Sequence, residues 1–182
     1  MDERIQAQEL VREHITSPTL LTHIYATEAI MRALANRLGQ DALKWALAGL
    51  LHDIDSEHTA QTPERHGAAG ADMLGMLGFD EEITHAVLSH AMTGEPRTSL
   101  LDHALYAAVP ATDLLLACAA LPGQPLEALT PSAVCARFAD SAFAPEIDRA
   151  AIDACTQVGL TREAFLALAL TAMQDDAQHP KP

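Results

Sequence analysis

The sequence predicts an all-α protein, and three observations support this fold class. The hydrophobic fraction is 49%, with many Ala and Leu residues, which suits a helical core. Apolar residues recur along most of the chain at the spacing of one helical face. Gly and Pro residues separate these stretches, and we find no credible strand. A length of 182 residues fits a single domain.

The first two predicted helices lie before Gly39. Residues 4–15 carry few apolar positions and predict a short helix. Pro18 suits the start of the next helix, at residues 19–38, and Gly39 is a natural C-terminal cap. One face of this second helix carries Leu20, His23, Ile24, Thr27, Ile30, Met31, Leu34 and Leu38. A histidine is therefore expected on a mainly apolar stripe.

The next predicted helix ends at a pair of potential metal ligands. Asp41 opens an apolar helix that runs to the adjacent residues His52 and Asp53. These two side chains lie about 100° apart around a helix, so both can reach one ion. Residues 54–62 are polar and lack periodicity, which predicts a loop beside the pair.

Two further helices carry histidines on their inner faces. Thr62 and Pro63 start the first, which ends at Gly78, and Asp80 caps the second. The inner faces carry His66, Gly70, Met73 and Leu77 in the first helix, and Ile83, Val87 and His90 in the second. Residues 92–98 contain Gly and Pro and predict another loop.

The rest of the chain predicts one long helix and three shorter ones. Residues 99–121 form a long apolar helix, and residues 122–125 are the clearest internal break. Pro131, Pro145 and Thr161 then mark three shorter helices that end near Met173. We expect residues 1–182 to form one domain, with a core at about 19–121 and a helical extension at about 126–175. The extension either completes the core or provides the surface of a homodimer.

Charge and composition exclude several classes of function. Eleven basic residues against twenty-five acidic ones give a net charge of −14, which repels the backbone of a nucleic acid polymer. Aromatic residues are only 4% of the chain, too few to favour a base-stacking platform. We expect no signal peptide and no membrane span. The three cysteines form no Cys-x-x-Cys pair, which favours free thiols in the cytoplasm.

Five predicted helices bring polar residues toward one core and predict a metal site. The candidate ligands are His23, His52, Asp53, His66, His90 and Asp113. Each histidine alone is more often a core residue bonded to a backbone carbonyl. Together they would be costly to bury without a shared partner, and metal is the economical one. Imidazoles and carboxylates suit one or two divalent ions of iron, manganese, zinc, nickel or cobalt.

Asp113 is expected to point toward the core, because it follows Leu105 and Val109 on the same helical face. A buried carboxylate requires a metal or a cationic partner. Arg32, Lys44, Arg65 and Arg97 are the cations that folding could bring close.

These motifs resemble, in order and approximate spacing, the HD-domain superfamily of metal-dependent phosphohydrolases, most closely its small bacterial single-domain HDIG proteins. The resemblance covers about residues 20–175. It is carried by Leu50-Leu51-His52-Asp53-Ile54-Asp55, Pro63-Glu64-Arg65-His66-Gly67, Ala86-Val87-Leu88-Ser89-His90, Ala104-Leu105-Tyr106-Ala107-Ala108 and Phe138-Ala139-Asp140-Ser141-Ala142-Phe143. It implies a compact all-α HD-domain bundle with additional C-terminal helices.

The sequence departs from the family pattern at two positions. In related chains the metal-binding Asp directly follows Tyr-Ala-Ala, and here Val109 stands in that place. Asp113 lies one helical turn later, about 6 Å along the axis, and could substitute if Pro110 shifts the helix. Asp55 also replaces the glycine of the Ile-Gly pair that names the HDIG group. Loss of a ligand at Val109 would weaken the metal site.

The resemblance implies roles for the candidate residues. His23, His52, Asp53 and Asp113 would hold one ion, and His66 and His90 a second, with Asp53 bridging. A metal-activated water would then attack a phosphate ester. From location alone, Arg65 or Lys44 could bind the phosphate and Glu57 or Asp55 could transfer a proton.

Three functions therefore remain open. The first is hydrolysis of phosphate esters, of a nucleotide or another small phosphorylated metabolite, with Asp53, Glu57 and Arg65 as catalytic residues. The second is a di-iron oxygenase, which the same superfamily contains. The third is a catalytically impaired regulatory or binding protein, which Val109 makes plausible.

Overall fold

The protein is all-α, as predicted. The computed structural model describes residues 3–91 and 93–178, and no strand occurs among them. Its α-helices are α1 (Glu3–His14), α2 (Pro18–Leu38), α3 (Ala42–Leu51), α4 (Ser56–Thr59), α5 (Ala68–Met76), α6 (Glu81–His90), α7 (Leu100–Ala119), α8 (Pro131–Ala139), α9 (Arg149–Asp153) and α10 (Arg162–Gln178). Its short 3-10 helices are η1 (Pro63–Arg65), η2 (Leu126–Ala128) and η3 (Ala154–Val158).

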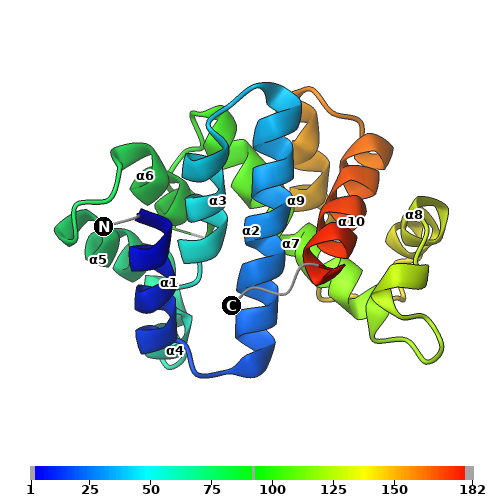
Figure 1. Cartoon of the computed structure of the whole chain (residues 1–182), viewed down its shortest axis with the longest axis horizontal. Helices are drawn as coiled ribbons and strands as arrows, with labels where there is room; N and C mark the ends of the chain where they lie inside the picture. The colour runs from blue at the N-terminus through cyan, green and yellow to red at the C-terminus, as the bar shows by residue number, and fades with distance from the viewer. Residues whose placement is uncertain (1–2, 92, 179–182) are drawn as a thin grey trace.

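Helix α2 runs through the centre of the molecule and packs on α3, α7 and α10 (Figure 1). Helices α1, α3, α5 and α6 lie on one side of it and α8 and α10 on the other. The Ser17 hydroxyl accepts a hydrogen bond from the Leu20 amide at its first turn. Gly39 ends the helix with a left-handed φ of 67°.

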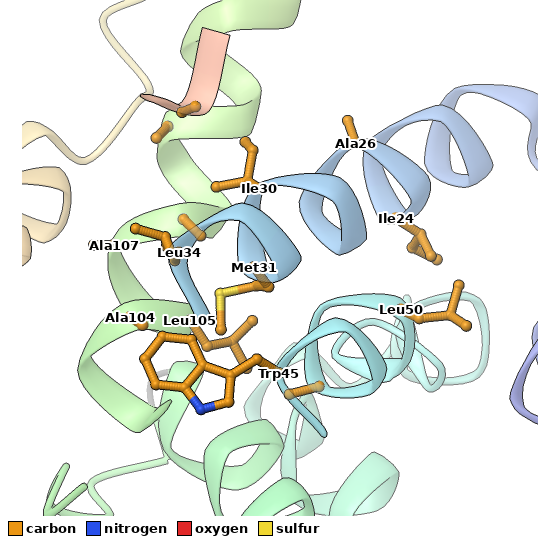
Figure 2. Close-up of a cluster of buried hydrophobic side chains, with 14 of the residues drawn as sticks. Ile24, Ala26, Ile30, Met31, Leu34, Trp45, Leu50, Ala104, Leu105 and Ala107 are labelled. Carbon is orange, nitrogen blue, oxygen red and sulfur yellow. The ribbon is translucent and has the colours of Figure 1, made fainter. Parts of the chain in front are cut away.

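The core lies where α2, α3 and α7 meet. Figure 2 shows Ile30 and Leu34 of α2, Trp45 of α3 and Leu105 of α7 in one buried cluster. Each fully buried Leu or Ile contributes roughly 1.5–3 kcal/mol relative to its exposed state. The three helices are thereby fixed relative to one another.

Gly49 lets α3 approach α2 closely. A Cβ at this position would lie 2.8 Å from the Thr27 carbonyl oxygen. Larger residues would therefore push α3 away from α2. The close crossing brings His52, at the end of α3, against His23 of α2.

Helix α7 is continuous through Pro110. The Ser99 hydroxyl and the Asp102 carboxylate form a capping box at its first turn. By length and composition α7 is the one helix in the described ranges that could cross a membrane. It packs on α2, α6 and α9 as a core helix, with 56% of its most apolar window buried.

The prediction of one continuous helix from Pro63 to Leu77 is wrong. This segment consists of η1 and α5, separated by His66 and Gly67. Gly67 has a φ of 80°, which only glycine adopts readily, so one continuous helix cannot form. His66 therefore lies in a turn rather than on a helical stripe. The loop predicted at 54–62 contains the short helix α4.

The C-terminal helices pack on α2 and α7. The helix predicted from Pro145 begins only at Arg149, whose guanidinium donates hydrogen bonds to carbonyl groups at the end of α8 and in the segment that follows it. The accepting carbonyls belong to Phe138, Asp140, Phe143, Ala144 and Ile147. Helix α10 continues to Gln178, beyond the predicted end at Met173. The division into a core and an extension stays a prediction.

Candidate metal centre

Four imidazoles converge on the carboxylate of Asp53. Asp53 Oδ2 lies 3.9 Å from His23 Nε2 and 3.4 Å from His52 Nε2. Asp53 Oδ1 lies 3.3 Å from His66 Nε2 and 3.7 Å from His90 Nε2. Each carboxylate oxygen therefore faces one pair of histidines. We call these the His23 half (His23, His52 and Oδ2) and the His66 half (His66, His90 and Oδ1).

The opposite nitrogen of each ring is held by an acceptor. His52 Nδ1 donates to the Gly49 carbonyl at 2.8 Å and His90 Nδ1 to the Val87 carbonyl at 2.5 Å. Both carbonyls lie three residues earlier, one turn back along the same helix. In the other two histidines Nδ1 pairs with a carboxylate, His23 with Asp113 and His66 with Asp55, each at 2.8 Å.

This pattern leaves the four Nε2 atoms as lone-pair donors toward a cation. Carbonyl and carboxylate oxygens only accept, so each Nδ1 carries a hydrogen, and each Nε2 can bind a metal ion once it carries none. The Nε2 atoms of His23 and His52 face each other at 3.1 Å. His90 Nε2 is buried without a hydrogen-bond partner. A metal ion in each half would satisfy these atoms, so the residues present fit divalent metal.

Asp55 builds the turn that carries His66. Its carboxylate is 1% exposed and accepts hydrogen bonds from the backbone amides of Gly67 and Gly70 as well as from His66. The two amides belong to the first turn of α5 and its N-cap, where backbone donors lack helical partners. Asp55 therefore caps α5 and orients His66 at the same time.

The charges of the centre shift its pKa values. Hydrogen bonds to Asp53 and Asp55 raise the pKa of His66 to about 10. Burial lowers the pKa of His23, but the hydrogen bond and charge of Asp113 outweigh it and raise the pKa. Burial lowers the pKa of His90. Burial also opposes ionisation of Asp53, yet the surrounding imidazoles hold its pKa well below the ordinary value. Bound metal would replace protons in this cluster.

A cavity of about 760 Å³ opens beside the centre. Its lining residues are Ser17, Thr19, Leu20, His23, Asp53, Ser56, Pro63, His66, His90, Ala91, Val109, Asp113 and Leu116. Within the described ranges this lining contains no Lys or Arg. Apolar side chains from α2 and α7 form one wall, and hydroxyl groups near the start of α2 and α4 add hydrogen-bonding groups.

Asp113 lies elsewhere than predicted. Its side chain is 51% exposed, so it does not point into the core. It is on the predicted face of α7, but here that face lines the cavity beside α2. Two groups of residues have ligand atoms within 4.8 Å of one another: His23, His52 and Asp53, and Asp53, His66 and His90. Asp113 belongs to neither.

The structure does not bring Glu57, Arg65 or Lys44 to the cavity. Glu57 instead accepts hydrogen bonds from the backbone amides at positions 16 and 17. Arg65 is exposed and borders a different groove, between α1 and α5. Lys44, at the far end of α3 from His52, pairs with Asp80 and Glu82.

Sequence reasoning missed the cavity wall and the positioning role of Asp55. Helical spacing could have identified the wall, because Leu20 precedes His23 by three residues and Leu116 follows Asp113 by three. No local signal identifies the contact between Asp55 and His66, since it depends on the turn at Gly67.

Comparison with known proteins gives the family. The HD domain matches residues 20–144, a range that contains every candidate ligand. The chain belongs to the HD-domain family. This family lies in a superfamily of metal-dependent phosphohydrolases, and HD-domain proteins bind divalent metals. The family resemblance and the all-α fold predicted from sequence are both confirmed.

Curated relatives of this HD domain match only part of it. Ribonuclease Y of Nitratidesulfovibrio vulgaris is 35% identical over 86 residues, 46% of this chain and 16% of the relative. Ribonuclease Y of Lawsonia intracellularis is 34% identical over 82 residues, 44% of this chain and 16% of the relative. The chain thus covers about one sixth of the length of these relatives. No solved structure gave a significant match.

Proposed function

We propose that this HD domain hydrolyses phosphate esters of small phosphorylated molecules with two divalent transition-metal ions. One observation carries the proposal. Four imidazole Nε2 atoms and both oxygens of Asp53 face a common centre beside an open cavity. His23, His52 and Asp53 would hold one ion, and Asp53, His66 and His90 the other. Ions in such a site activate water and neutralise charge on phosphoryl oxygens.

The cavity lining favours a small substrate with a single phosphate. Without Lys or Arg in the described lining, phosphate charge would be met by the metal ions alone. Asp53 and Asp113 repel additional negative charge. Leu20, Val109 and Leu116 offer an apolar surface to the rest of the molecule. A compact monoester fits these groups better than a polyphosphate.

The named relatives raise RNA as a possible substrate. A protein with a net charge of −14 repels a phosphate backbone, and the cavity lining adds no cation to offset it. We therefore expect RNA to be a poorer substrate than a small monoester. A short RNA belongs in the test for this reason.

The test measures phosphate release after loading the ion-free protein separately with manganese, iron, cobalt, nickel or zinc. Substrates are p-nitrophenyl phosphate, nucleoside monophosphates and a short RNA. We expect turnover of the monoesters with at least one metal and its loss on chelation. Asp53→Ala, which removes the shared ligand, should reduce turnover to background. Absence of turnover with every metal in the presence of bound ions would reject hydrolysis.

A di-iron oxygenase is the second candidate. Each half of the centre offers two imidazoles and one carboxylate oxygen, a ligand set that also serves iron oxygenases. Iron-loaded protein that consumes oxygen with a small organic substrate, and releases no phosphate from the monoesters, would favour this reaction. Retained ions with neither activity would favour a regulatory binding protein.

A further inference from the structure

The position of Asp113 is fixed by the packing of α7 on α2. Helix α7 is continuous through Pro110, so Asp113 stays one turn beyond Val109, about 6 Å along the axis. The adjacent Thr112 is fully buried, and its hydroxyl lies 3.0 Å from the hydroxyl of Thr27 on α2. Thr27 in turn follows His23 by one turn. This contact holds α2 and α7 in the register that pairs Asp113 with His23.

Asp113 contacts the outer edge of the His23 ring. Its Oδ1 atom is 2.8 Å from His23 Nδ1, whereas His23 Nε2 faces His52 and Asp53. The two nitrogens point in different directions from the ring, so Asp113 and the centre lie on different sides of it. This geometry explains why Asp113 is outside both groups of converging ligand atoms.

We propose that Asp113 is a positioning residue that orients His23, and that the ion of the His23 half is bound by His23, His52 and Asp53 alone. Asp113 fixes the hydrogen on Nδ1 and directs the lone pair of Nε2 toward the ion. Asp55 makes the same contact with His66, also at 2.8 Å. The proposal rests on the metal centre of the proposed function but not on the reaction performed there.

The test uses Co²⁺ and the full chain without any substrate. Affinity and stoichiometry come from titration of the ion-free protein, and the visible absorption spectrum at saturation reports the ligands of the ion. The variants are Asp113→Ala and Asp113→Asn. Asp72→Asn, which changes another exposed aspartate on the separate helix α5, is the matched control.

Asp113→Ala should weaken Co²⁺ binding in the His23 half about tenfold. This is the smaller end of the effect expected when a residue that hydrogen-bonds a metal ligand is removed, because Asp113 is half exposed. The spectrum at saturation should stay unchanged. Asp113→Asn should recover nearly the original affinity, because an exposed amide can turn its oxygen toward the Nδ1 hydrogen. The Asp72→Asn control should match the unmodified protein.

Three results would overturn the inference. A changed spectrum at saturation in Asp113→Ala would make Asp113 a ligand, as would an Asp113→Asn variant that binds as weakly as Asp113→Ala. Unchanged affinity in Asp113→Ala would leave the residue without a role in positioning. Failure of the unmodified protein to bind Co²⁺ would instead reject the metal centre itself. Circular dichroism of each variant separates these outcomes from misfolding.

Discussion

The two halves of the centre support their histidines differently. In the His66 half, Asp55 is 1% exposed and also binds two backbone amides, so His66 is held by a closed buried network. In the His23 half, Asp113 is 51% exposed. His23 itself lies within the long helix α2, whereas His66 lies in a turn between two short helices.

This difference indicates where the rigidity of each ligand originates. The backbone of α2 already limits the directions available to His23, so its carboxylate partner refines an orientation that the helix provides. The turn at His66 is held by one backbone hydrogen bond, from the His66 amide to the Pro63 carbonyl, so the direction of its ring depends more on Asp55. We therefore expect the same kind of substitution to have a larger effect at Asp55 than at Asp113.

Asp53→Ala should have the largest effect, because it removes an oxygen from each half at once. We expect loss of both ions, measured by elemental analysis after dialysis. His90→Ala is the comparison, since it removes one ligand from the His66 half and should leave the His23 half loaded. If Asp53→Ala retained one full equivalent, the two halves would not share this carboxylate.

Asp55→Asn should come next and should affect one half. The asparagine must keep its single oxygen toward the amides of Gly67 and Gly70, which turns its NH₂ group toward His66 Nδ1. This arrangement favours the tautomer with hydrogen on Nε2, which cannot bind metal. We expect loss of the ion in the His66 half with little loss of stability, in contrast to Asp113→Asn.

Asp55→Ala separates capping from positioning. It leaves the buried amide donors of Gly67 and Gly70 without their acceptor, which should lower the free energy of unfolding by roughly 2–4 kcal/mol. Denaturant unfolding of ion-free protein measures this loss. Equal stability of Asp55→Ala and the unmodified protein would mean that water replaces the carboxylate, and the contrast between the halves would be smaller.

The sequence predicts the helices and most of the convergence because both follow from periodicity. His23 and His90 repeat with apolar neighbours, and the His-Asp pair ends an apolar helix, so their faces follow from 3.6 residues per turn. The same reasoning misjudged Asp113. Periodicity identifies the side of α7 on which it lies but not that this side borders a cavity at that level.

The contacts of the outer nitrogens could not be predicted from the sequence. The pairing of His66 with Asp55 requires the left-handed turn at Gly67, which a periodic pattern does not encode. The catalytic roles of Glu57 and Arg65 were predicted from their position along the chain beside the His-Asp pair. Neither side chain lines the cavity. Their catalytic roles stay predictions without structural support.

Metal binding should release protons mainly from the His66 half. The pKa of His66 is raised from 6.5 to about 10, first by Asp53 and then by Asp55, so the ion-free ring is protonated at neutral pH. Its contribution to ion-free stability is fully present below pH 6.5 and is lost as the pH rises toward 10. Because metal competes with this proton, affinity should increase with pH over the same range.

Calorimetry in two buffers of different ionisation enthalpy measures the released protons. We expect about one proton for the ion in the His66 half at neutral pH. His90 should contribute little, because burial lowers its pKa and keeps the ring neutral. Binding without proton release, or affinity that does not change with pH, would contradict the protonated state of His66.

Glu57→Ala should have the smallest effect and should leave both halves loaded. Glu57 joins α4 to the segment between α1 and α2 through the backbone amides at positions 16 and 17, and these hydrogen bonds lower its pKa. Its stabilising contribution is therefore present above the ordinary pKa of 4.5 and is lost as the pH falls. We expect a slightly lower melting temperature at pH 7, no difference in acid, and unchanged metal content.

Glu64→Ala changes an exposed residue of η1 and is the matched control. Loss of an ion in Glu57→Ala alone would show that this segment helps to hold the metal centre.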